Sequence, residues 1–297
     1  MYGSGEEFSY NECASCGSLQ IAEVPAHLAE FYPQDYYSFD NIIEESPLKQ
    51  FLIRRRSQYL AGQLSPVGWL YSQLTPAPSS PSWFPHKAVQ FDDAILDVGC
   101  GAGAYLTQLG YMGFSKLTGI DPFIKQDRRF SNGISILKRS LEEADGKYSF
   151  IMLHHSLEHM SDQESAMEHL YRLLLPLGRV LIRIPVAGTF AWQKYRTDWA
   201  QLDAPRHLNV HTEVGLKALA KRTGFEVERV VYDSTGFQFW GSEQIKRGLP
   251  LIDKATGVIE PRADVFTKDE LIAFEQQAET LNKTGQGDQA CFYLRKA

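Results

Sequence analysis

AILDVGCGAGAYL, residues 94–106, is the segment of this chain that indicates its fold most clearly. It runs from a mostly apolar segment into three glycines at alternate positions, Gly99, Gly101 and Gly103, and then into a segment that favours a helix. Glycine permits backbone torsions and a close ligand approach that a side chain would prevent. In an open α/β sheet, ligands bind beyond the carboxyl ends of the strands. The stretch therefore predicts the first strand of such a sheet, with a ligand beside the turn that follows it.

Two acidic residues narrow the class of ligand. Asp97 lies two residues before the first glycine, where a carboxylate would repel a pyrophosphate and attract an ammonium or sulfonium group. Asp121 closes the segment LTGID, where an acid about 20 residues after the turn can accept hydrogen bonds from ribose hydroxyls. It can also cap a helix that begins at Pro122. The glycine spacing alone also fits a dinucleotide site, but the two acids favour a ligand with a ribose and a cationic group.

Strands and helices alternate through the rest of the chain, which is typical of an α/β protein with a doubly wound, mainly parallel sheet. Ser161 and Glu164 have capping-box spacing and predict one helix start. Thr212 and Gly224 predict the two ends of a later helix. Seven segments are expected as strands: AILDV, KLTGI, ISIL, YSFIML, RVLIRI, FEVERVVY and ACFYLRKA.

The chain is expected to contain three regions. Residues 1–40 are a short, aromatic-rich segment, and residues 41–92 combine a helical stretch with the linker TPAPSSPSWFP, whose prolines prevent a helix from continuing. Residues 93–297 form the α/β domain. Within that domain, residues 236–288 separate the last two strands by far more than the usual ~2–6 residues. We expect this insertion to cover a site.

Two features of the first regions have alternative interpretations. Cys13 and Cys16 have the spacing of one zinc knuckle, but a structural zinc needs four ligands. Two reduced cysteines are therefore favoured over a zinc ion completed by His27 or by a second chain. The run Arg54 to Arg56 is interpreted as a solvated helix face, with a phosphate-bearing substrate or a membrane surface as the alternative.

Composition limits the partners. The chain has 297 residues, 43% of them apolar, so it can bury a large core, and its net charge of −6 gives no broad cationic surface for nucleic acid. No segment has the ~20 consecutive apolar residues of a membrane span. The first residues, MYGSGEEFSY, lack a signal-peptide pattern, and four cysteines suit a reducing compartment. A cytoplasmic location is therefore expected.

Several segments, taken in order, resemble the class I S-adenosylmethionine-dependent methyltransferases. ILDVGCGAGAY resembles the first motif of that family, LTGID its ribose-binding acid, FIMLHHSLEHM its fourth-strand segment and LLLPLGRVLIRIP its fifth-strand motif. The later segment DWAQLDAPRHLNVHTEVGLKALAKRTGFEVERV resembles a branch with many small-molecule and sugar-pathway members. Residues 1–40 resemble part of a zinc ribbon that precedes some members of this branch.

The resemblance implies a Rossmann-like sheet of seven mainly parallel strands with an antiparallel last strand, and S-adenosyl-L-methionine as the cofactor. It also implies the cofactor-binding residues: Gly99, Gly101 and Gly103 for the methionine portion, Asp97 for the amino group, Asp121 for the ribose, Ser140 and Leu141 for the adenine, and His154 as a further contact. The alternatives are a protein that binds the cofactor without catalysis and an NAD-dependent Rossmann enzyme.

The expected reaction is methyl transfer to a small polar acceptor, with a sugar or nucleotide-linked sugar as the first expectation. We expect the acceptor site to form from the helical residues 47–75, the loop RTDWAQLDAPRHLNVHT and the 236–288 insertion. Aromatic residues of these segments can stack on the acceptor or belong to the core; they are Trp192, Tyr195, Trp199, Phe237, Phe239 and Trp240.

Two histidine-rich segments, HHSLEHM and PRHLNVH, supply candidate catalytic residues: His155, His207 and His211. A neutral imidazole could take a proton from an acceptor hydroxyl. The first segment also resembles the metal-binding Glu-x-x-Glu-His of some small-RNA and ubiquinone-pathway O-methyltransferases. By that resemblance His155, Glu158 and His159, with His207 or His211, would hold a divalent ion, and the nitrogen ligands would suit zinc or another transition metal. A purely structural role for Glu158 and His159, at the start of a helix, is the alternative.

Overall fold

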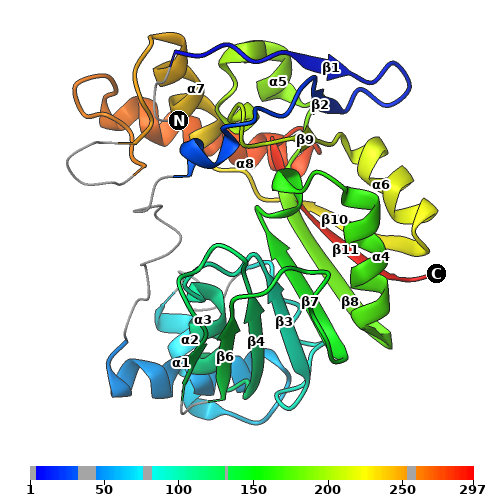
Figure 1. The fold of residues 1–297 in the computed structure, drawn as a ribbon. Coiled ribbons are helices and arrows are strands. Elements are labelled where there is room, and N and C mark those ends of the chain that lie inside the picture. The colour runs from blue at the N-terminus through cyan, green and yellow to red at the C-terminus, as the bar shows by residue number, and fades with distance from the viewer. Residues whose placement is uncertain (1–4, 33–44, 76–81, 131–132, 253–258) are drawn as a thin grey trace.

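Figure 1 shows the computed structural model, which describes residues 5–32, 45–75, 82–130, 133–252 and 259–297. Residues 33–40 of the expected N-terminal segment, 76–81 of the expected linker and 253–258 of the expected insertion lie outside the described residues. The strands are β1 (Tyr10–Glu12), β2 (Leu19–Ile21), β3 (Ala94–Val98), β4 (Lys116–Ile120), β5 (Arg128–Arg129), β6 (Ile134–Leu137), β7 (Tyr148–His154), β8 (Leu174–Pro185), β9 (Asn209–Val210), β10 (Phe225–Tyr232) and β11 (Gln289–Lys296). The α-helices are α1 (Pro47–Leu60), α2 (Pro66–Leu74), α3 (Ala104–Met112), α4 (Gln163–Leu173), α5 (Phe190–Tyr195), α6 (Glu213–Arg222), α7 (Phe237–Lys246) and α8 (Lys268–Lys283), and the 3-10 helices are η1 (Leu28–Phe31), η3 (Leu157–His159), η4 (Arg196–Asp198) and η5 (Ala200–Leu202).

A sheet of eight strands organises the chain, in the order β10-β11-β8-β7-β3-β4-β6-β5. The strands from β8 to β6 are parallel neighbours, whereas β11 lies antiparallel between β8 and β10. The Rossmann-like sheet and its antiparallel last strand are thus confirmed. The difference is β5, a two-residue strand that pairs antiparallel with β6 at the edge. The parallel strands end at one edge of the sheet, where α/β proteins bind ligands.

Apolar side chains cover both faces of this sheet. Successive residues of a strand point to opposite faces: Phe150 and Met152 of β7 belong to the core cluster that includes α3, whereas Ile151 and Leu153 belong to the cluster that includes α4 and α6. All four side chains are fully buried. β7 is therefore covered on both sides, as its continuous apolar run predicts.

The N-terminal region is joined to the large domain by strand pairing. β1 and β2 form an antiparallel hairpin, and β2 pairs with β9 (Figure 1). The Tyr10 hydroxyl donates a hydrogen bond to the carbonyl of His207 at 2.7 Å. The Thr212 hydroxyl donates to the carbonyl of Cys16 at 2.7 Å and accepts from the N–H of Gly215 as the N-cap of α6. The hairpin therefore braces the segment that carries His207.

The connection between β10 and β11 contains α7 and α8, which make a third core cluster with the loop after β8. Phe239 of α7 is fully buried, and Phe274 of α8 stacks on it with ring centroids 5.4 Å apart. α8 begins with a capping box formed by Thr267 and Glu270. Among the described residues, no helix is both long and apolar enough to cross a bilayer.

The two predicted helix starts have different outcomes. α6 has the predicted N-cap, Thr212. The predicted capping box of Ser161 and Glu164 is wrong, because α4 begins at Gln163 and its N-cap is Asp162, whose side chain accepts a backbone hydrogen bond at 2.9 Å. Two neighbouring polar residues could each cap this helix, and the carboxylate does so.

Tyr10→Phe should lower the free energy of unfolding by about 1 kcal/mol, because it removes one partly buried hydrogen bond between the hairpin and the His207 carbonyl. Urea denaturation measures this change. The matched control is Tyr59→Phe, at a ring that is 36% exposed, where we expect a change below about 0.5 kcal/mol. Equal midpoints for the two variants would show that the Tyr10 hydroxyl does not brace the loop.

Candidate functional site

The glycine turn lies between β3 and α3. Gly99, Gly101 and Gly103 have φ values of 74°, 52° and 86°, in the left-handed region that glycine adopts without strain. Space is limited as well, because a Cβ at Gly99 would lie 2.6 Å from the Cβ of Ser156, and one at Gly103 would lie 2.3 Å from Ile136 Cδ1. Both the torsions and the close packing therefore require glycine here.

Asp121 ties this turn to the end of β4. One of its carboxylate oxygens accepts the N–H of Gly101 at 3.0 Å, and the other accepts the N–H of Phe123 at 2.8 Å. No helix follows at Pro122, so the helix-capping interpretation of Asp121 is wrong. Burial raises the pKa of this carboxyl. Its oxygens retain lone pairs for further donors such as hydroxyl groups.

Asp97 is the buried acid at the end of β3. It is only 2% exposed, and its Oδ2 atom has no hydrogen-bond partner within the described part of the chain. Burial, with the Asp121 carboxylate nearby, raises the pKa of Asp97 to about 8. A buried carboxylate without a partner is costly, and a cation beside it would offset that cost. The turn is therefore suited to a ligand with a positively charged group.

The other three residues expected at the cofactor lie at the ends of neighbouring strands. Ser140 and Leu141 follow β6, which pairs with β4, and Leu141 is buried. His154 ends β7, but its ring is enclosed by Trp83 and Tyr105, with centroids 4.1 Å and 4.4 Å away. Burial lowers the pKa of His154 well below its ordinary value. His154 is therefore a neutral side chain packed between two aromatic rings.

A second group of polar side chains begins directly after β7. His155 has a φ of 50°, an uncommon torsion for a residue other than glycine, and its Nδ1 atom lies 3.2 Å from Glu158 Oε1. Glu158, in η3, is 1% exposed. Burial opposes its ionisation, but the hydrogen bond with His155 and the nearby histidines outweigh this and lower the pKa of Glu158 to about 2. A buried carboxylate thus orients the half-exposed ring of His155.

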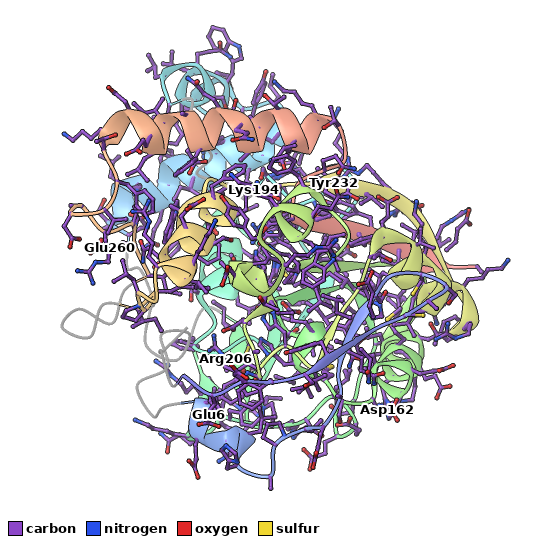
Figure 2. The ribbon with its side chains drawn as sticks, turned by 90° about the horizontal axis from the view of Figure 1, so that it is seen from above. Glu6, Asp162, Lys194, Arg206, Tyr232 and Glu260 are labelled. Atoms are coloured by element: carbon purple, nitrogen blue, oxygen red, sulfur yellow. The ribbon has the colours of Figure 1, made fainter. Side chains whose placement is uncertain are left out.

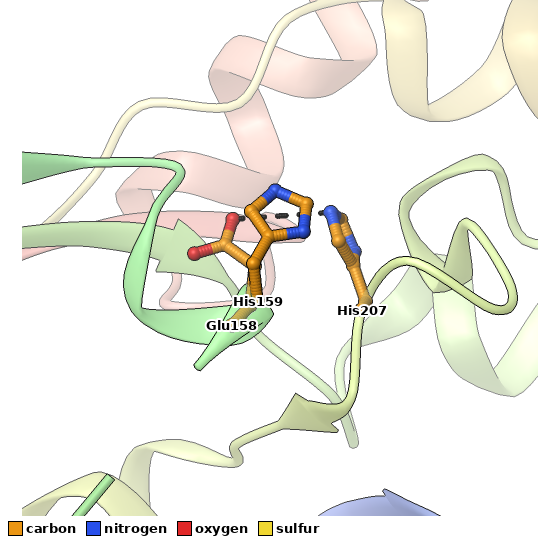
Figure 3. A group of neighbouring side chains, drawn as sticks. All are labelled: Glu158, His159 and His207. Atoms are coloured by element: carbon orange, nitrogen blue, oxygen red, sulfur yellow. Dashed lines mark ion pairs between the residues drawn. The ribbon is translucent and has the colours of Figure 1, made fainter. Parts of the chain in front are cut away.

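His159 and His207 face the same carboxylate (Figure 3). Nδ1 of His159 lies 2.9 Å from the carbonyl of Arg206, and Nδ1 of His207 lies 2.7 Å from the carbonyl of Gln201. Because a carbonyl only accepts, we assign the proton of each neutral ring to Nδ1, which leaves both Nε2 atoms with a lone pair. One ligand atom from each of Glu158, His159 and His207 lies within 4.8 Å of the others.

Burial and the neighbouring His159 lower the pKa of His207 to about 4. The His207 ring is therefore neutral near pH 7 and keeps its Nε2 lone pair. Two imidazole nitrogens and one carboxylate are a donor set that suits a divalent transition metal. The chain thus presents three side chains that could hold such an ion at the edge of the sheet.

A cavity of about 340 Å³ lies beside these groups. Asp203, in its wall, pairs with the buried Arg206, whose guanidinium lies 5.8 Å from the ring centroid of Tyr32. Figure 2 shows Arg206 next to the N-terminal segment that carries Glu6. The cavity walls are formed by His155, His159, Ala200, Gln201, Asp203, His207, Phe237, Trp240, Ile259 and Gln289. The loop after β8, α7 and the start of β11 therefore meet at this cavity.

Of the three candidate catalytic histidines, the structure brings His155 and His207 together but not His211. Nε2 of His211 is 2.5 Å from Gln163 Oε1, and the residue lines a separate hollow of about 510 Å³ between β2, α4 and α6. β9 lies between His207 and His211 and pairs with β2, which directs the two rings to different sides. Burial lowers the pKa of His211 to about 4.

Cys13 and Cys16 lie in the turn between β1 and β2 as free thiols. Among the described residues, no group of three metal-ligating side chains includes either of them. His27, the ligand considered for this half-site, instead pairs with Glu6 at 3.2 Å.

Only part of the expected acceptor site is found at the cavity. Phe237 and Trp240 line it, but the other expected aromatics belong to the third core cluster: Trp192, Tyr195, Trp199 and Phe239. The described residues 45–75 contribute nothing to its walls; Ile53 of α1 instead packs in the cluster that includes α3. Two cavity residues were not predicted from the sequence, Asp203 and Gln289. Asp203 lies four residues before His207, and this spacing was a usable signal. Gln289 comes from a distant strand, and the sequence contains no signal for it.

Comparison with known proteins gives relatives that match part of the chain. The ubiquinone biosynthesis O-methyltransferase of Pseudomonas paraeruginosa is 29% identical over 125 residues, which cover 37% of this chain and 53% of the relative. The mitochondrial enzyme of the same description from Mus musculus is 26% identical over 160 residues, 41% of this chain and 43% of the relative. The chain thus spans about half the length of these curated relatives.

Among solved structures, an S-adenosylmethionine dependent methyltransferase from Mesorhizobium loti is 15% identical, with a TM-score of 0.46 over 72% of this chain and 94% of that one. The sequence model of the family described as Methyltransferase domain matches residues 56–230, more than half of the chain. This match favours a methyltransferase over the alternative of an NAD-dependent Rossmann enzyme. The chain belongs to the methyltransferase domain family.

Proposed function

We propose that the glycine turn and the two acids beside it hold S-adenosyl-L-methionine. The supporting observation is the buried Oδ2 atom of Asp97, which lacks a partner among the described residues and suits the cofactor's amino group. Asp121, whose carboxylate already orients the turn, would accept the ribose hydroxyls. The remaining proposed contacts are Gly99, Gly101 and Gly103 with the methionine portion and Ser140 and Leu141 with the adenine. His154 is left out of this set, because aromatic rings enclose it.

The cofactor supplies an activated methyl group on a sulfonium, so the chain has to orient an acceptor and manage its proton. His155 is the proposed general base, because Glu158 fixes one ring nitrogen and the ring borders the cavity. The negative charge of Glu158 would stabilise the imidazolium that forms. Ser156, the residue that follows His155, packs on Gly99. His155 therefore lies next to a residue that contacts the glycine turn.

We further propose that Glu158, His159 and His207 hold a divalent transition metal. The supporting observations are the Nε2 atom of His207, 4.0 Å from Glu158 Oε1, and the ligand atoms of Glu158, His159 and His207, which lie within 4.8 Å of one another. A Lewis acid there would lower the pKa of an acceptor hydroxyl. In this arrangement Glu158, His159 and His207 would hold the ion, and His155 would accept the proton of the acceptor hydroxyl.

The acceptor is proposed to be a small molecule with an aromatic hydroxyl. The partial relatives are named as ubiquinone biosynthesis O-methyltransferases, and Phe237, Trp240 and Ile259 give the cavity an apolar wall. A sugar hydroxyl is the second candidate, because Gln201, Asp203 and Gln289 add polar groups beside Trp240. Residues 93–297 would form the catalytic domain, with the insertion at residues 236–288 covering the acceptor.

The affinity for S-adenosylhomocysteine, which carries the same amino group, should rise between pH 6 and pH 8. Below its raised pKa of about 8, Asp97 is protonated and must release a proton to hold a cation, so affinity should increase by up to about tenfold per pH unit. Above that pKa the dependence should flatten. Isothermal titration calorimetry across this pH range, in two buffers of different ionisation enthalpy, measures both the affinity and the released proton.

Asp97→Asn should bind the same ligand more weakly and lose this pH dependence, while Asp92→Asn, at an exposed residue before β3, should behave as wild type. A flat profile in the wild type, or the same slope in Asp97→Asn, would contradict the proposed role of Asp97.

His155→Ala and His207→Ala should each lower turnover by about 10²- to 10⁴-fold, with affinity for S-adenosylhomocysteine changed less than about threefold. Formation of S-adenosylhomocysteine with a panel of catechols and nucleotide-sugars measures turnover and distinguishes the two acceptor classes. The control is His169→Ala, whose ring bonds to its own helix, α4. Wild-type turnover in both variants would contradict the proposed roles of His155 as base and His207 as metal ligand. Activity unaffected by a chelator would contradict the proposed metal.

A further inference from the structure

α2 is an apolar helix with almost no buried surface. Of its nine residues only Gly68 is buried. Val67, Leu70 and Leu74 have the i, i+3, i+7 spacing of one helical stripe, and they are 43%, 51% and 70% exposed. Trp69, on another side of the helix, is 51% exposed. A short apolar helix this exposed within the described structure lacks the cover that a core helix has.

α1 and α2 form a helical hairpin, called the α1–α2 hairpin below. Its other parts also expose apolar side chains. Leu64, in the turn between α1 and α2, is 97% exposed, and Leu48 and Phe51 of α1 are 69% and 45% exposed. α1 does bury a face of its own, which includes Ile53 in the core cluster of α3. The hairpin is therefore attached to the domain through α1, while its tip and α2 present apolar side chains outward.

The hairpin is held rigidly enough to present these side chains as one surface. A Cβ at Gly68 would lie 2.0 Å from the carbonyl oxygen of Arg55, so the two helices touch at this point. The Ser65 hydroxyl donates to the same carbonyl at 2.9 Å. Arg56 is buried and donates to the carbonyl of Thr75 at 3.1 Å, which fixes the end of α2. Exposure of the apolar side chains is thus part of an ordered helical pair.

The charge of this region is opposite to that of the whole chain. Residues 46–90 contain no Asp or Glu, although the net charge of the protein is −6. The cations of this segment are Lys49, Arg54, Arg55, Arg56 and Lys87. Arg54, Arg55 and Lys87 are exposed, and the guanidinium of Arg55 lies 5.1 Å from the ring centroid of Phe51. A basic and an apolar side chain therefore lie together at Arg55 and Phe51, and the exposed Arg54 side chain lies beside Gly113 at the end of α3.

This surface is separate from the proposed active site. Figure 1 shows α1 and α2 at the end of the molecule away from β1, β2 and α7. None of the described residues 45–75 lines the cavity beside His155.

We propose that the α1–α2 hairpin docks on the surface of an anionic lipid bilayer. Val67, Leu70, Leu74 and Leu64 would enter the boundary between headgroups and acyl chains, with Trp69 at the interface level that its indole ring favours. Arg54 and Arg55 would contact lipid phosphates, and the absence of acidic residues in this segment removes repulsion from an anionic surface. A helix of nine residues is too short to span a bilayer, so the hairpin lies along the surface.

Flotation of the full chain with lipid vesicles tests this assignment. The chain should bind vesicles of phosphatidylcholine with about one quarter phosphatidylglycerol, bind pure phosphatidylcholine at least about tenfold more weakly, and dissociate as sodium chloride rises from about 0.1 M to about 0.5 M. Equal binding to both vesicles would overturn the role of the cations. No binding to either would overturn the proposal.

Matched variants locate the contact. Leu70→Glu should reduce vesicle binding at least about tenfold, and Arg54→Glu with Arg55→Glu should do so at low salt. The control is Leu177→Glu, at a side chain that is 93% exposed on β8 and should bind as wild type. Unchanged thermal unfolding of each variant ensures that binding, not folding, is measured. Docking through the α1–α2 hairpin would be contradicted if Leu177→Glu alone lost vesicle binding, or if Leu70→Glu bound vesicles as well as wild type.

Tryptophan fluorescence gives an independent readout. The chain has five tryptophans; Trp69 is 51% exposed, and Trp83, Trp192, Trp199 and Trp240 are at most 9% exposed. Lipids brominated on the acyl chain should quench the wild type, and Trp69→Phe should remove that quenching. Quenching that persists in Trp69→Phe would contradict the assignment. Analytical ultracentrifugation tests whether the α1–α2 hairpin instead joins two copies of the chain. Self-association that Leu70→Glu abolishes, in a chain that does not bind vesicles, would contradict the assignment.

Discussion

The hydrogen bond from Gly101 N to Asp121 Oδ2 joins the glycine turn after β3 to the end of β4, and the geometry of the site depends on this connection. The turn can pack against β6 and the residues after β7 because its glycines adopt positive φ values and leave no Cβ against Ile136 and Ser156. The same packing removes Asp97 from water and leaves one of its oxygens without a partner among the described residues. Close packing and an unsatisfied buried acid are two consequences of one tight turn, and together they make the position suitable for a cationic ligand.

Strand order explains why chemistry from distant segments meets at this turn. β7 pairs with β3, so the residues after β7 lie next to the glycines, and Ser156 contacts Gly99 directly. β8 pairs with β7, and the loop that follows it returns His207 to Glu158. The N-terminal hairpin then supports that loop through strand pairing with β9 and through Tyr10. The sheet therefore sets the position of the cavity, and the β1–β2 hairpin supports the loop that forms one of its walls.

The parallel sheet and the glycine turn could be predicted from sequence because they rest on local patterns: apolar runs of strand length, and glycines with an acid at fixed spacing. What the local pattern did not contain was the direction of side chains after short or irregular segments. His207 and His211 are four residues apart, but β9 and its pairing with β2 send His211 to Gln163. The helical segment before the linker was expected at the acceptor site, yet Ile53 anchors it beside α3. Helix capping was likewise decided between Ser161 and Asp162 by backbone geometry that spacing alone does not give.

The most direct measurement is a crystal structure of the chain with S-adenosylhomocysteine. We predict that the ligand's amino group lies within hydrogen-bonding distance of the Asp97 carboxylate, that its ribose hydroxyls contact Asp121, and that its sulfur atom faces the cavity bordered by His155 and Trp240. A ligand bound away from the glycine turn, or with its sulfur atom directed away from that cavity, would contradict the joining of cofactor turn and histidine cluster into one active site.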